Sequence, residues 1–243
     1  MNCLLGEDSR PSLMAFVATL NEEKGVGPTL AELHQYLGNV SILVVDGRSS
    51  DRTAEIAKDH GADVIVQPRK GKGDALAEAI RHVSSNYGPS EADLKYVVIS
   101  DADYTYPAEY VPEMLDILEA DPKVGMVCGN RFNSHLHLKR AMKNMFYLGN
   151  RILAFTHNML NGVDLRDPLT GLRVVRWNIL RDWIPKSKGF DVEVELNHLV
   201  ERKGYSIKEV EIEYRPRLGQ KKLKLRHGIT IFRRILSESA RDF

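Results

Sequence analysis

Short runs of apolar residues alternate with segments of helical periodicity through the first half of the chain. The apolar runs, which predict strands buried on both faces, occupy residues 13–18, 41–45, 63–66, 96–99 and 124–128. The helical segments, in which apolar residues recur every three or four positions, occupy residues 29–38, 52–60, 74–83 and 112–119. This alternation predicts an α/β fold with a mostly parallel, doubly wound sheet and helices on both of its faces.

The second half of the chain has a less regular pattern. Residues 133–161 are helical in pattern, apolar on one side and interleaved with basic residues. A helix pair packed into the core and an amphipathic element at a membrane interface both fit this pattern. The remaining expectations are a polar loop at 164–173, a strand at 172–175, a helix at 190–202, an edge strand at 205–214, a basic loop at 215–223 and an amphipathic helix at 229–239.

Length and charge suggest one large domain with an uneven electrostatic surface. The 243 residues carry a net charge of +1, and residues 1–243 are expected to form a single catalytic domain. The segment 215–243 is different, because residues 215–241 hold many arginines and lysines and a single acid, Glu238. We expect that end to favour anions or an anionic membrane surface, whereas the chain as a whole carries no signal for nucleic acid.

The two cysteines and the hydropathy pattern indicate a protein of the reducing cell interior. Cys128 lies within an apolar run and is expected to be a buried thiol, and Cys3 is far from it in sequence. There is no secretory signal pattern and no run that approaches the roughly 20 apolar residues of a membrane span. We therefore expect a cytoplasmic protein that contacts the membrane peripherally.

The candidate chemistry centres on Asp101 and Asp103, which follow the apolar run at 96–99. Side chains two residues apart at a strand end point the same way, so both carboxylates can face one point. Mg²⁺ or Mn²⁺ that bridges to a substrate phosphate is a common solution for such a pair. The alternative is a solvated turn in which Asp103 caps the following helix.

Polar residues also follow the neighbouring strands. They are Asn21 and Glu22, Asp46, Lys70 and Lys72, and Arg131. Ligands of parallel α/β sheets bind at the carboxyl ends of the strands, so these side chains are expected to form one site with the Asp-x-Asp turn. Asp46 fits a ribose contact or a turn cap, and the basic residues around Lys72 fit a phosphate or a solvated loop.

Two familiar nucleotide motifs are absent from this sequence. The segment 69–73 is not a Walker A loop, and no Gly-x-Gly-x-x-Gly follows the first expected strand. These absences argue against a P-loop enzyme and against a dinucleotide dehydrogenase. Later in the chain, the loop at 164–173 offers two arginines suited to phosphate, while the acids at 191–195 fit the start of a helix.

Taken in order, these residues resemble the family-2 glycosyltransferases with the GT-A nucleotide-sugar-binding fold. They look most similar to the branch that transfers hexoses to dolichyl or polyprenyl phosphate, which includes dolichol-phosphate mannose synthases and archaeal N-glycosylation enzymes. The segments that carry the resemblance lie at 19–22, 45–53, 71–73, 101–103, 129–132, 167–173 and 217–223. Together they extend over nearly the whole chain.

The resemblance implies a role for each matching residue. It implies nucleotide binding by Thr19, Asn21, Glu22, Asp46, Lys72 and Asp101. It implies catalytic roles for Asp101, Asp103, Arg131 and Arg173, with Asp103 and also Asp101 as ligands of Mg²⁺ or Mn²⁺. It implies contacts with the acceptor or the diphosphate for Arg140, Arg217, Lys221 and Lys222.

The sequence departs from the family pattern at several positions. Leu20 replaces an aromatic residue, Lys221 replaces a serine, and Thr105 stands where close relatives have a glutamine. Many relatives also carry C-terminal membrane spans, for which this sequence shows no apolar run.

The activity that the resemblance implies is inverting transfer of a hexose from UDP-glucose, UDP-N-acetylglucosamine or GDP-mannose to dolichyl or polyprenyl phosphate. The product would be a lipid-linked donor for protein glycosylation, made by an enzyme peripheral at the inner face of the cell membrane. Three alternatives stay open: a glycosyltransferase with a soluble phosphorylated acceptor, a non-catalytic nucleotide-sugar-binding protein, and a nucleotidyltransferase. The last normally carries a glycine-rich loop after the first strand, which residues 19–27 do not supply.

Overall fold

The structure is a computed structural model that describes residues 12–86, 94–132, 145–161, 164–220, 222 and 225–240. Its strands are β1 (Ser12–Thr19), β2 (Ser41–Asp46), β3 (Asp63–Val66), β4 (Leu94–Asp101), β5 (Val124–Asn130), β6 (Arg173–Arg176) and β7 (Ser206–Glu211). Its α-helices are α1 (Val26–Leu37), α2 (Thr53–Asp59), α3 (Lys72–Asn86), α4 (Val111–Ala120), α6 (Met145–Asn161), α7 (Trp177–Leu180), α8 (Val192–Arg202) and α9 (Leu225–Ser239). A 3₁₀ turn, η2 (Ala108–Tyr110), precedes α4.

In the described part of the chain, seven strands form one sheet in the order β3-β2-β1-β4-β6-β5-β7. Strands β1 to β4 pair in parallel, and β7 pairs in parallel with β5. Strand β6 lies between β4 and β5 and runs antiparallel to both. The predicted mostly parallel α/β sheet is therefore confirmed, and the expected edge strand near residue 205 is β7.

Alternating side chains of each strand enter two separate cores, one on each face of the sheet. In β1, Ala15 and Val17 face the core beneath α1, α2 and α4, whereas Met14 and Phe16 face the core beneath α3, α7 and α8. Both faces of the central strands are therefore covered, which is why their sequences are continuous apolar runs. Cys128 belongs to the second core, and burial raises the pKa of its thiol to about 12.

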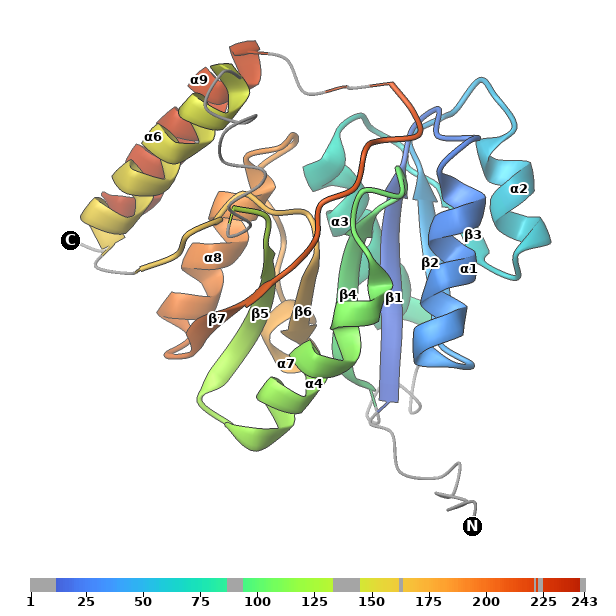
Figure 1. Cartoon of the computed structure of the whole chain (residues 1–243), viewed down its shortest axis with the longest axis horizontal. Coiled ribbons are helices and arrows are strands. Elements are labelled where there is room, and N and C mark those ends of the chain that lie inside the picture. The colour runs from blue at the N-terminus through green and yellow to red at the C-terminus, as the bar shows by residue number, and fades with distance from the viewer. Residues whose placement is uncertain are drawn as a thin grey trace.

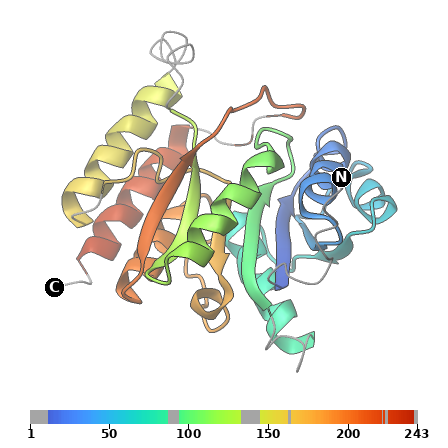
Figure 2. The ribbon, with the colours of Figure 1, turned by 60° about the horizontal axis from the view of Figure 1, so that its bottom comes forward.

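Helices α6 and α9 form an additional layer outside α8. They lie side by side at the edge of the molecule in both views (Figure 1, Figure 2). A small apolar cluster joins them to α8 through Leu153, Val194, Ile231 and Ile235. Each of the two outer helices buries one stripe in this way and leaves another stripe open, because its apolar residues cover more than one face.

Helices α1 and α3, which border the site, begin earlier than their sequence patterns predict. Helix α1 starts at Val26 rather than at residue 29, because the Thr29 hydroxyl donates back to the Gly25 carbonyl instead of capping the helix. Helix α3 starts at Lys72 rather than at residue 74, so Lys72 and Gly73 belong to its first turn. Gly38 does end α1, with a φ of 68° that favours glycine.

Candidate active site

The carboxyl ends of β1, β2 and β4 lie next to one another and gather the polar residues predicted from the sequence. Thr19 of β1 pairs in register with Asp46 of β2, and Ala18 of β1 pairs with Asp101 of β4. Asp46 and Asp101 therefore flank β1 at the same edge of the sheet. This is where parallel α/β sheets bind their ligands.

The backbone turns sharply as it leaves each of these three strands. Asn21 after β1, Arg48 after β2 and Tyr104 after β4 have φ values of 49°, 65° and 64°. These are the described residues other than glycine with positive φ. Such left-handed conformations cost energy in residues other than glycine and concentrate at functional sites.

Asp46 accepts hydrogen bonds from the end of β1 and from its own turn. The Thr19 hydroxyl donates to Oδ1 at 3.1 Å, and Ser49 donates from its backbone N–H to Oδ2 at 2.9 Å and from its hydroxyl to Oδ1 at 2.5 Å. The turn-cap interpretation of Asp46 is thus present in the structure. A carboxylate has about four lone-pair positions, so further donors can still be accepted.

Glu22 is a buried carboxylate that is surrounded by basic groups. Its backbone N–H donates to the Thr53 hydroxyl at 2.8 Å, which orders the turn after β1. Its Oε1 contacts the ammonium of Lys222 and lies 3.3 Å from Nη1 of Arg217. Burial raises the pKa of Glu22 above its ordinary value, and Lys222 opposes that effect.

Asp101 forms an ion pair with Lys72, and Lys72 in turn contacts a further carboxylate. Lys72 Nζ lies 2.6 Å from Asp101 Oδ1 and 2.8 Å from Glu193 Oε1. Although burial alone would raise the pKa of Asp101, the Lys72 charge outweighs it and holds that pKa below its usual value. The pKa of Lys72 is raised above its usual value, because the negative charges of the two carboxylates outweigh the effect of its burial.

The glycines on either side of Lys72 allow this lysine to reach the site. A Cβ on Gly71 would overlap the carbonyl of Lys188, and a Cβ on Gly73 would overlap the carbonyl of Ser187. The Gly73 N–H donates to the Lys188 carbonyl at 3.0 Å. The Gly-Lys-Gly segment therefore serves close packing on the turn before α8, and this packing brings Lys72 to Glu193.

Asp103 is held by hydrogen bonds from Thr105, two residues later in the chain. Thr105 donates to Oδ1 of Asp103 from its hydroxyl at 2.5 Å and from its backbone N–H at 3.1 Å. The other oxygen, Oδ2, contacts Nη2 of Arg217. Burial, with a further contribution from Asp101, raises the pKa of Asp103 above its usual value.

The basic segment after β7 crosses over these carboxylates; we call residues 215–220 and 222 the strap. Figure 1 shows this part of the chain passing the carboxyl ends of β4 and β1 before it returns to α9. The Arg215 N–H donates to the Thr105 carbonyl at 3.0 Å, and the Leu218 N–H donates to the Asp103 carbonyl at 3.2 Å. Gly219 lies so close to Glu22 that a Cβ there would overlap Oε2. The strap thus brings its cations directly to the site.

Arg131 lies at the end of β5 and faces Asp167. Its Nε is 2.6 Å from Oδ2 of Asp167, and its Nη2 donates to Oδ1 at 2.8 Å. The rings of Tyr106, Phe132 and Tyr214 lie within 6.0 Å of the guanidinium carbon. The planar guanidinium of Arg131, which would suit a phosphate, is therefore paired with the Asp167 carboxylate in this structure.

Arg173 lies in the interior, where 1% of the residue is exposed. Its guanidinium donates to the carbonyls of Thr170 and Pro168, at 3.0 and 2.7 Å, and to the side chain of Asn197 at 2.5 Å. This geometry favours a role in fixing the loop before β6 over the phosphate contact expected from the sequence. Arg140 and Lys221, the other two predicted anion contacts, lie outside the described residues.

Sequence comparisons show the family to which the chain belongs. Residues 14–183 match the family described as Glycosyl transferase family 2. The chain belongs to this family. It is 34% identical to a protein of Haloferax volcanii named Dolichyl-phosphate hexose transferase, over 87% of this chain and 86% of that relative. It is also 32% identical to Glycosyltransferase AglJ of the same organism, over 82% of this chain but only 61% of the relative's length.

Solved structures show that this glycosyltransferase has the GT-A fold. Glucosyl-3-phosphoglycerate synthase from Mycobacterium tuberculosis, in complex with Mn²⁺, UDP-glucose and phosphoglyceric acid, aligns with a TM-score of 0.72 at 21% identity. The alignment covers 95% of this chain and 80% of that chain. The same enzyme with Mg²⁺ and UDP aligns with a TM-score of 0.72 at 20% identity. At these identities the likeness establishes the fold.

The carboxylates of this glycosyltransferase fit a divalent cation that is shared with a phosphorylated ligand. Asp103 Oδ2 is buried and makes no hydrogen bond within the described part of the chain, although Arg217 contacts it. Carboxylate oxygens are the ligands that Mg²⁺ and Mn²⁺ prefer. The described residues contain no group of three or more acids, histidines or cysteines placed to hold a metal.

Two residues of the site were not assigned to it from the sequence. Glu193 fitted the first turn of α8, where acids are common, and nothing in its spacing pointed to Lys72. Thr105 was considered only as a replacement for a metal ligand, whereas it donates to Asp103. A cavity of about 20 Å³ lies beside this part of the site and is lined by Lys72, Glu193 and Arg173 among mostly apolar side chains.

Proposed function

We propose that this family 2 glycosyltransferase transfers a hexose from a nucleoside diphosphate sugar to dolichyl or polyprenyl phosphate, with inversion at the anomeric carbon. The observation that carries the proposal is the site itself. Carboxylates that end or follow β1 and β4 pair with the cations of Lys72, Arg217 and Lys222 at one edge of the sheet. The similarity to a relative named Dolichyl-phosphate hexose transferase supports the choice of acceptor.

The donor would occupy the edge of the sheet at β1, β2 and β4. Glu22 and Asp46 would contact the nucleoside, and Lys72, Arg217 and Lys222, which pair with carboxylates at this edge, would contact the diphosphate. Asp103, with Asp101 beside it, would hold Mg²⁺ or Mn²⁺, which when bound neutralises charge on the diphosphate. A UDP-sugar is our preferred donor over GDP-mannose.

The chemistry requires positioning more than proton transfer. The acceptor phosphate is already an anion at neutral pH, so its oxygen can attack the anomeric carbon without a strong general base. The new C–O bond forms as the bond to the diphosphate breaks, and the nucleoside diphosphate leaves with the electron pair. The strap cations would stabilise that charge, and the strap would shield the donor from water.

The outer helices provide a surface suited to a lipid acceptor. Ile152, Phe155 and Met159 of α6 recur at helical spacing and are 55%, 67% and 64% exposed. Ile229 and Phe232 of α9 form a similar exposed stripe. We call these two stripes the outer apolar face. Single exposed apolar residues are common, but exposed stripes on two neighbouring helices indicate a surface that is covered by something else.

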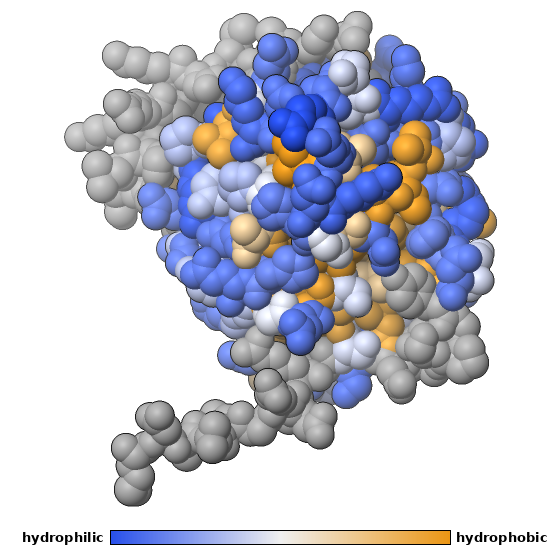
Figure 3. Space-filling model, turned by 90° about the vertical axis from the view of Figure 1, so that its right-hand side faces the viewer, coloured by the Kyte–Doolittle hydropathy of each residue, from blue (hydrophilic) through white to orange (hydrophobic). Residues whose placement is uncertain are grey.

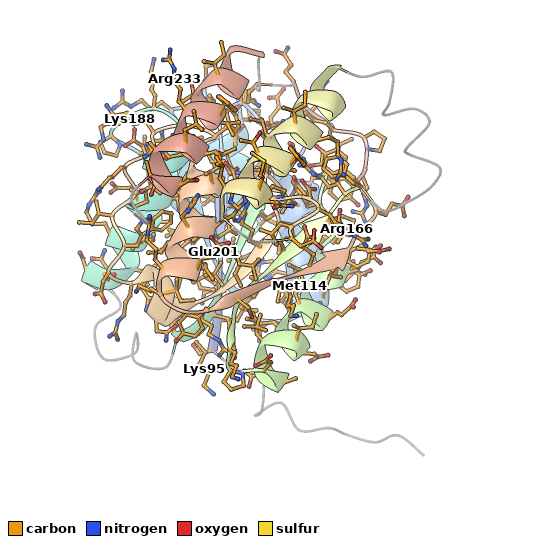
Figure 4. All side chains as sticks on the ribbon, turned by 90° about the vertical axis from the view of Figure 1, so that its left-hand side faces the viewer. Lys95, Met114, Arg166, Lys188, Glu201 and Arg233 are labelled. Atoms are coloured by element: carbon orange, nitrogen blue, oxygen red, sulfur yellow. The ribbon has the colours of Figure 1, made fainter. Side chains whose placement is uncertain are left out.

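Basic residues border the outer apolar face. Figure 4 shows Arg233 and Lys188 beside α9 and Arg166 beside α6, and all three are exposed. Apolar stripes with basic borders suit the interface of an anionic bilayer. The opposite side of the molecule, with α1, α2 and β3, is mostly hydrophilic with apolar patches between the hydrophilic residues (Figure 3). Among the described residues, no helix has both the length and the apolar character needed to cross a bilayer.

The decisive experiment is a transfer assay with the purified protein, Mn²⁺ and vesicles that contain dolichyl phosphate. Radiolabelled UDP-glucose, UDP-N-acetylglucosamine and GDP-mannose are supplied separately, and label is measured in the lipid fraction. We expect lipid-soluble product from one donor, and its loss in Asp103→Asn. Absence of lipid product with every donor would contradict the proposed acceptor.

A soluble phosphorylated acceptor is the second candidate. It is favoured by the structural similarity to an enzyme crystallised with phosphoglyceric acid. The same assay with phosphoglyceric acid in place of the vesicles separates the two, because the labelled product then stays in the aqueous phase.

A further inference from the structure

The two oxygens of Asp103 have different surroundings. Oδ1 accepts both hydrogen bonds from Thr105, at 2.5 and 3.1 Å. Oδ2 makes no hydrogen bond among the described residues and faces the strap. Because Asp103 is only 1% exposed, water cannot readily donate a hydrogen bond to this second oxygen. Whatever cation binds Asp103 must therefore approach Oδ2.

Arg217 occupies that approach. Its Nη2 contacts Oδ2 of Asp103, while its Nη1 lies 3.3 Å from Oε1 of Glu22. One guanidinium thus bridges two carboxylates whose side chains are 2% and 5% exposed. Buried carboxylates need a positive partner, and Arg217 supplies it from a distant part of the sequence.

A divalent cation cannot bind the same oxygen while Arg217 is there. Oxygen ligands lie about 2.0–2.6 Å from Mg²⁺ or Ca²⁺, so a bound ion would need the space that Nη2 fills. Two cations at that separation also repel strongly in a site with little water. The positions of Arg217 and the metal therefore exclude each other.

We propose that Arg217 and a divalent cation are alternative occupants of Asp103 Oδ2, so that the strap suppresses metal binding until a nucleoside diphosphate is present. The inference rests on the proposed function in taking Asp103 as a metal ligand. A diphosphate offers Arg217 new oxygen partners and brings further ligands for the metal. Metal and nucleotide then bind cooperatively, and each raises the affinity for the other by the same factor.

The exchange requires movement of one side chain. The strap is anchored by backbone hydrogen bonds from Arg215 to Thr105 and from Leu218 to Asp103. Arg215 is fixed further by Glu32, which accepts from its two terminal nitrogens at 2.9 and 2.8 Å. These anchors do not involve the Arg217 guanidinium, so it can turn from Asp103 towards a diphosphate while the strap stays in place.

The test measures Mn²⁺ binding by the protein alone, from the electron paramagnetic resonance signal of free Mn²⁺. Wild type is compared with Arg217→Gln and with Arg215→Gln, a matched control in the same strap with an equally exposed side chain of 26%. We expect Arg217→Gln to bind Mn²⁺ about tenfold more tightly, within the usual range for coupled sites. Arg215→Gln should bind as wild type does, and adding Asp103→Asn to Arg217→Gln should abolish the gain.

Two results would overturn the inference: equal Mn²⁺ affinity in wild type and Arg217→Gln, or a gain that survives Asp103→Asn. Thermal melting checks that each variant is folded. Arg217→Lys keeps the positive charge but loses the planar guanidinium, so its affinity for Mn²⁺ should lie between those of wild type and Arg217→Gln. No sugar or acceptor is present in this test. If the transfer assay fails but Arg217→Gln binds Mn²⁺ more tightly than wild type, the proposed acceptor is rejected. The proposal that Arg217 and the cation exclude each other at Asp103 is then still supported.

Discussion

Thr105 Oγ1 donates a 2.5 Å hydrogen bond to Oδ1 of Asp103, and both residues are almost completely buried. Two residues after an acid, a hydroxyl can reach back to the carboxylate, as in many turns. Here the bond fixes which oxygen of Asp103 remains available to a cation. Thr105 is thus a positioning residue that acts through Asp103.

Replacing Thr105 by valine should weaken the use of metal without unfolding the protein. Thr105→Val keeps the shape but removes one of the two donors to Asp103, a loss worth about 1–3 kcal/mol in a buried site. We expect kcat/KM to fall about tenfold, with a higher Mn²⁺ concentration needed for half-maximal rate. Thr105→Ser, which retains the hydroxyl, should restore both values. Identical metal dependence in the valine variant and wild type would show that the bond does not position Asp103.

Removing the charge of Lys72 should destabilise the fold as well as the donor site. Lys72→Gln leaves Asp101 and Glu193 near each other without their shared cation, which we expect to cost about 3 kcal/mol in the free energy of unfolding. Adding Glu193→Gln should recover part of that loss, because one of the two stranded charges is removed. Urea unfolding measures these differences.

Lys70→Gln is the control for the lysine series, because Lys70 is exposed and lies two residues before Lys72. Its free energy of unfolding should match that of wild type. If Lys72→Gln were as stable as Lys70→Gln, the carboxylate–lysine–carboxylate arrangement would carry no stabilisation.

The glycine beside Lys72 should tolerate no side chain. In Gly73→Ala the new Cβ would overlap the backbone oxygen of Ser187, and we expect a loss of about 2–4 kcal/mol in unfolding free energy. Gly149→Ala in α6 is the matched control, because nothing lies within 4 Å of its Cβ position. That control should gain about 0.5–1 kcal/mol from the lower entropy of the unfolded chain. A neutral Gly73→Ala would contradict the packing of the start of α3 on the segment before α8.

Stability should decrease on acidification because of His157. Burial, with contributions from His198 and Arg173, lowers the pKa of His157 to about 4, from 6.5. The unfolded chain therefore binds more protons between these values, so the stability from neutral His157 is present above pH 6.5 and is lost as pH falls towards 4. The loss is about 3 kcal/mol over the whole window. Melting temperatures measured across this range should show a smaller decline in His157→Gln than in wild type, whereas His82→Gln, on the surface of α3, should follow wild type.

The outer apolar face should determine binding to anionic vesicles. Replacing Phe155 and Met159 by serine removes two large exposed apolar side chains, so vesicle affinity should fall by at least about tenfold. Val66→Ser is the control, because Val66 is 59% exposed but lies on β3, away from α6 and α9. Flotation with vesicles measures the bound fraction. Equal flotation of the double variant and wild type would exclude this face as the membrane contact.

Much of the architecture could be predicted because it depends on local pattern. Buried strands such as β2 and β4 need continuous apolar runs, and each run ends where polar residues begin. Parallel strands bring those ends together, so Asp46, Asp101 and Asp103 could be placed at one edge before the structure was known. The antiparallel insertion of β6 between β4 and β5 could not be predicted in the same way, because strand order depends on packing between segments far apart in sequence.

The amino-acid sequence by itself determined the α/β alternation, the cluster of acids at the strand ends and the presence of a late basic segment. Only the tertiary structure decided which cation meets which carboxylate. Arg131 and Arg173 have the residue type of phosphate ligands, yet one pairs with Asp167 and the other bonds interior carbonyls. Arg217 instead reaches Asp103. The physical reason is that ion pairs and buried hydrogen bonds form between residues distant in sequence, and spacing along the chain carries no information about them.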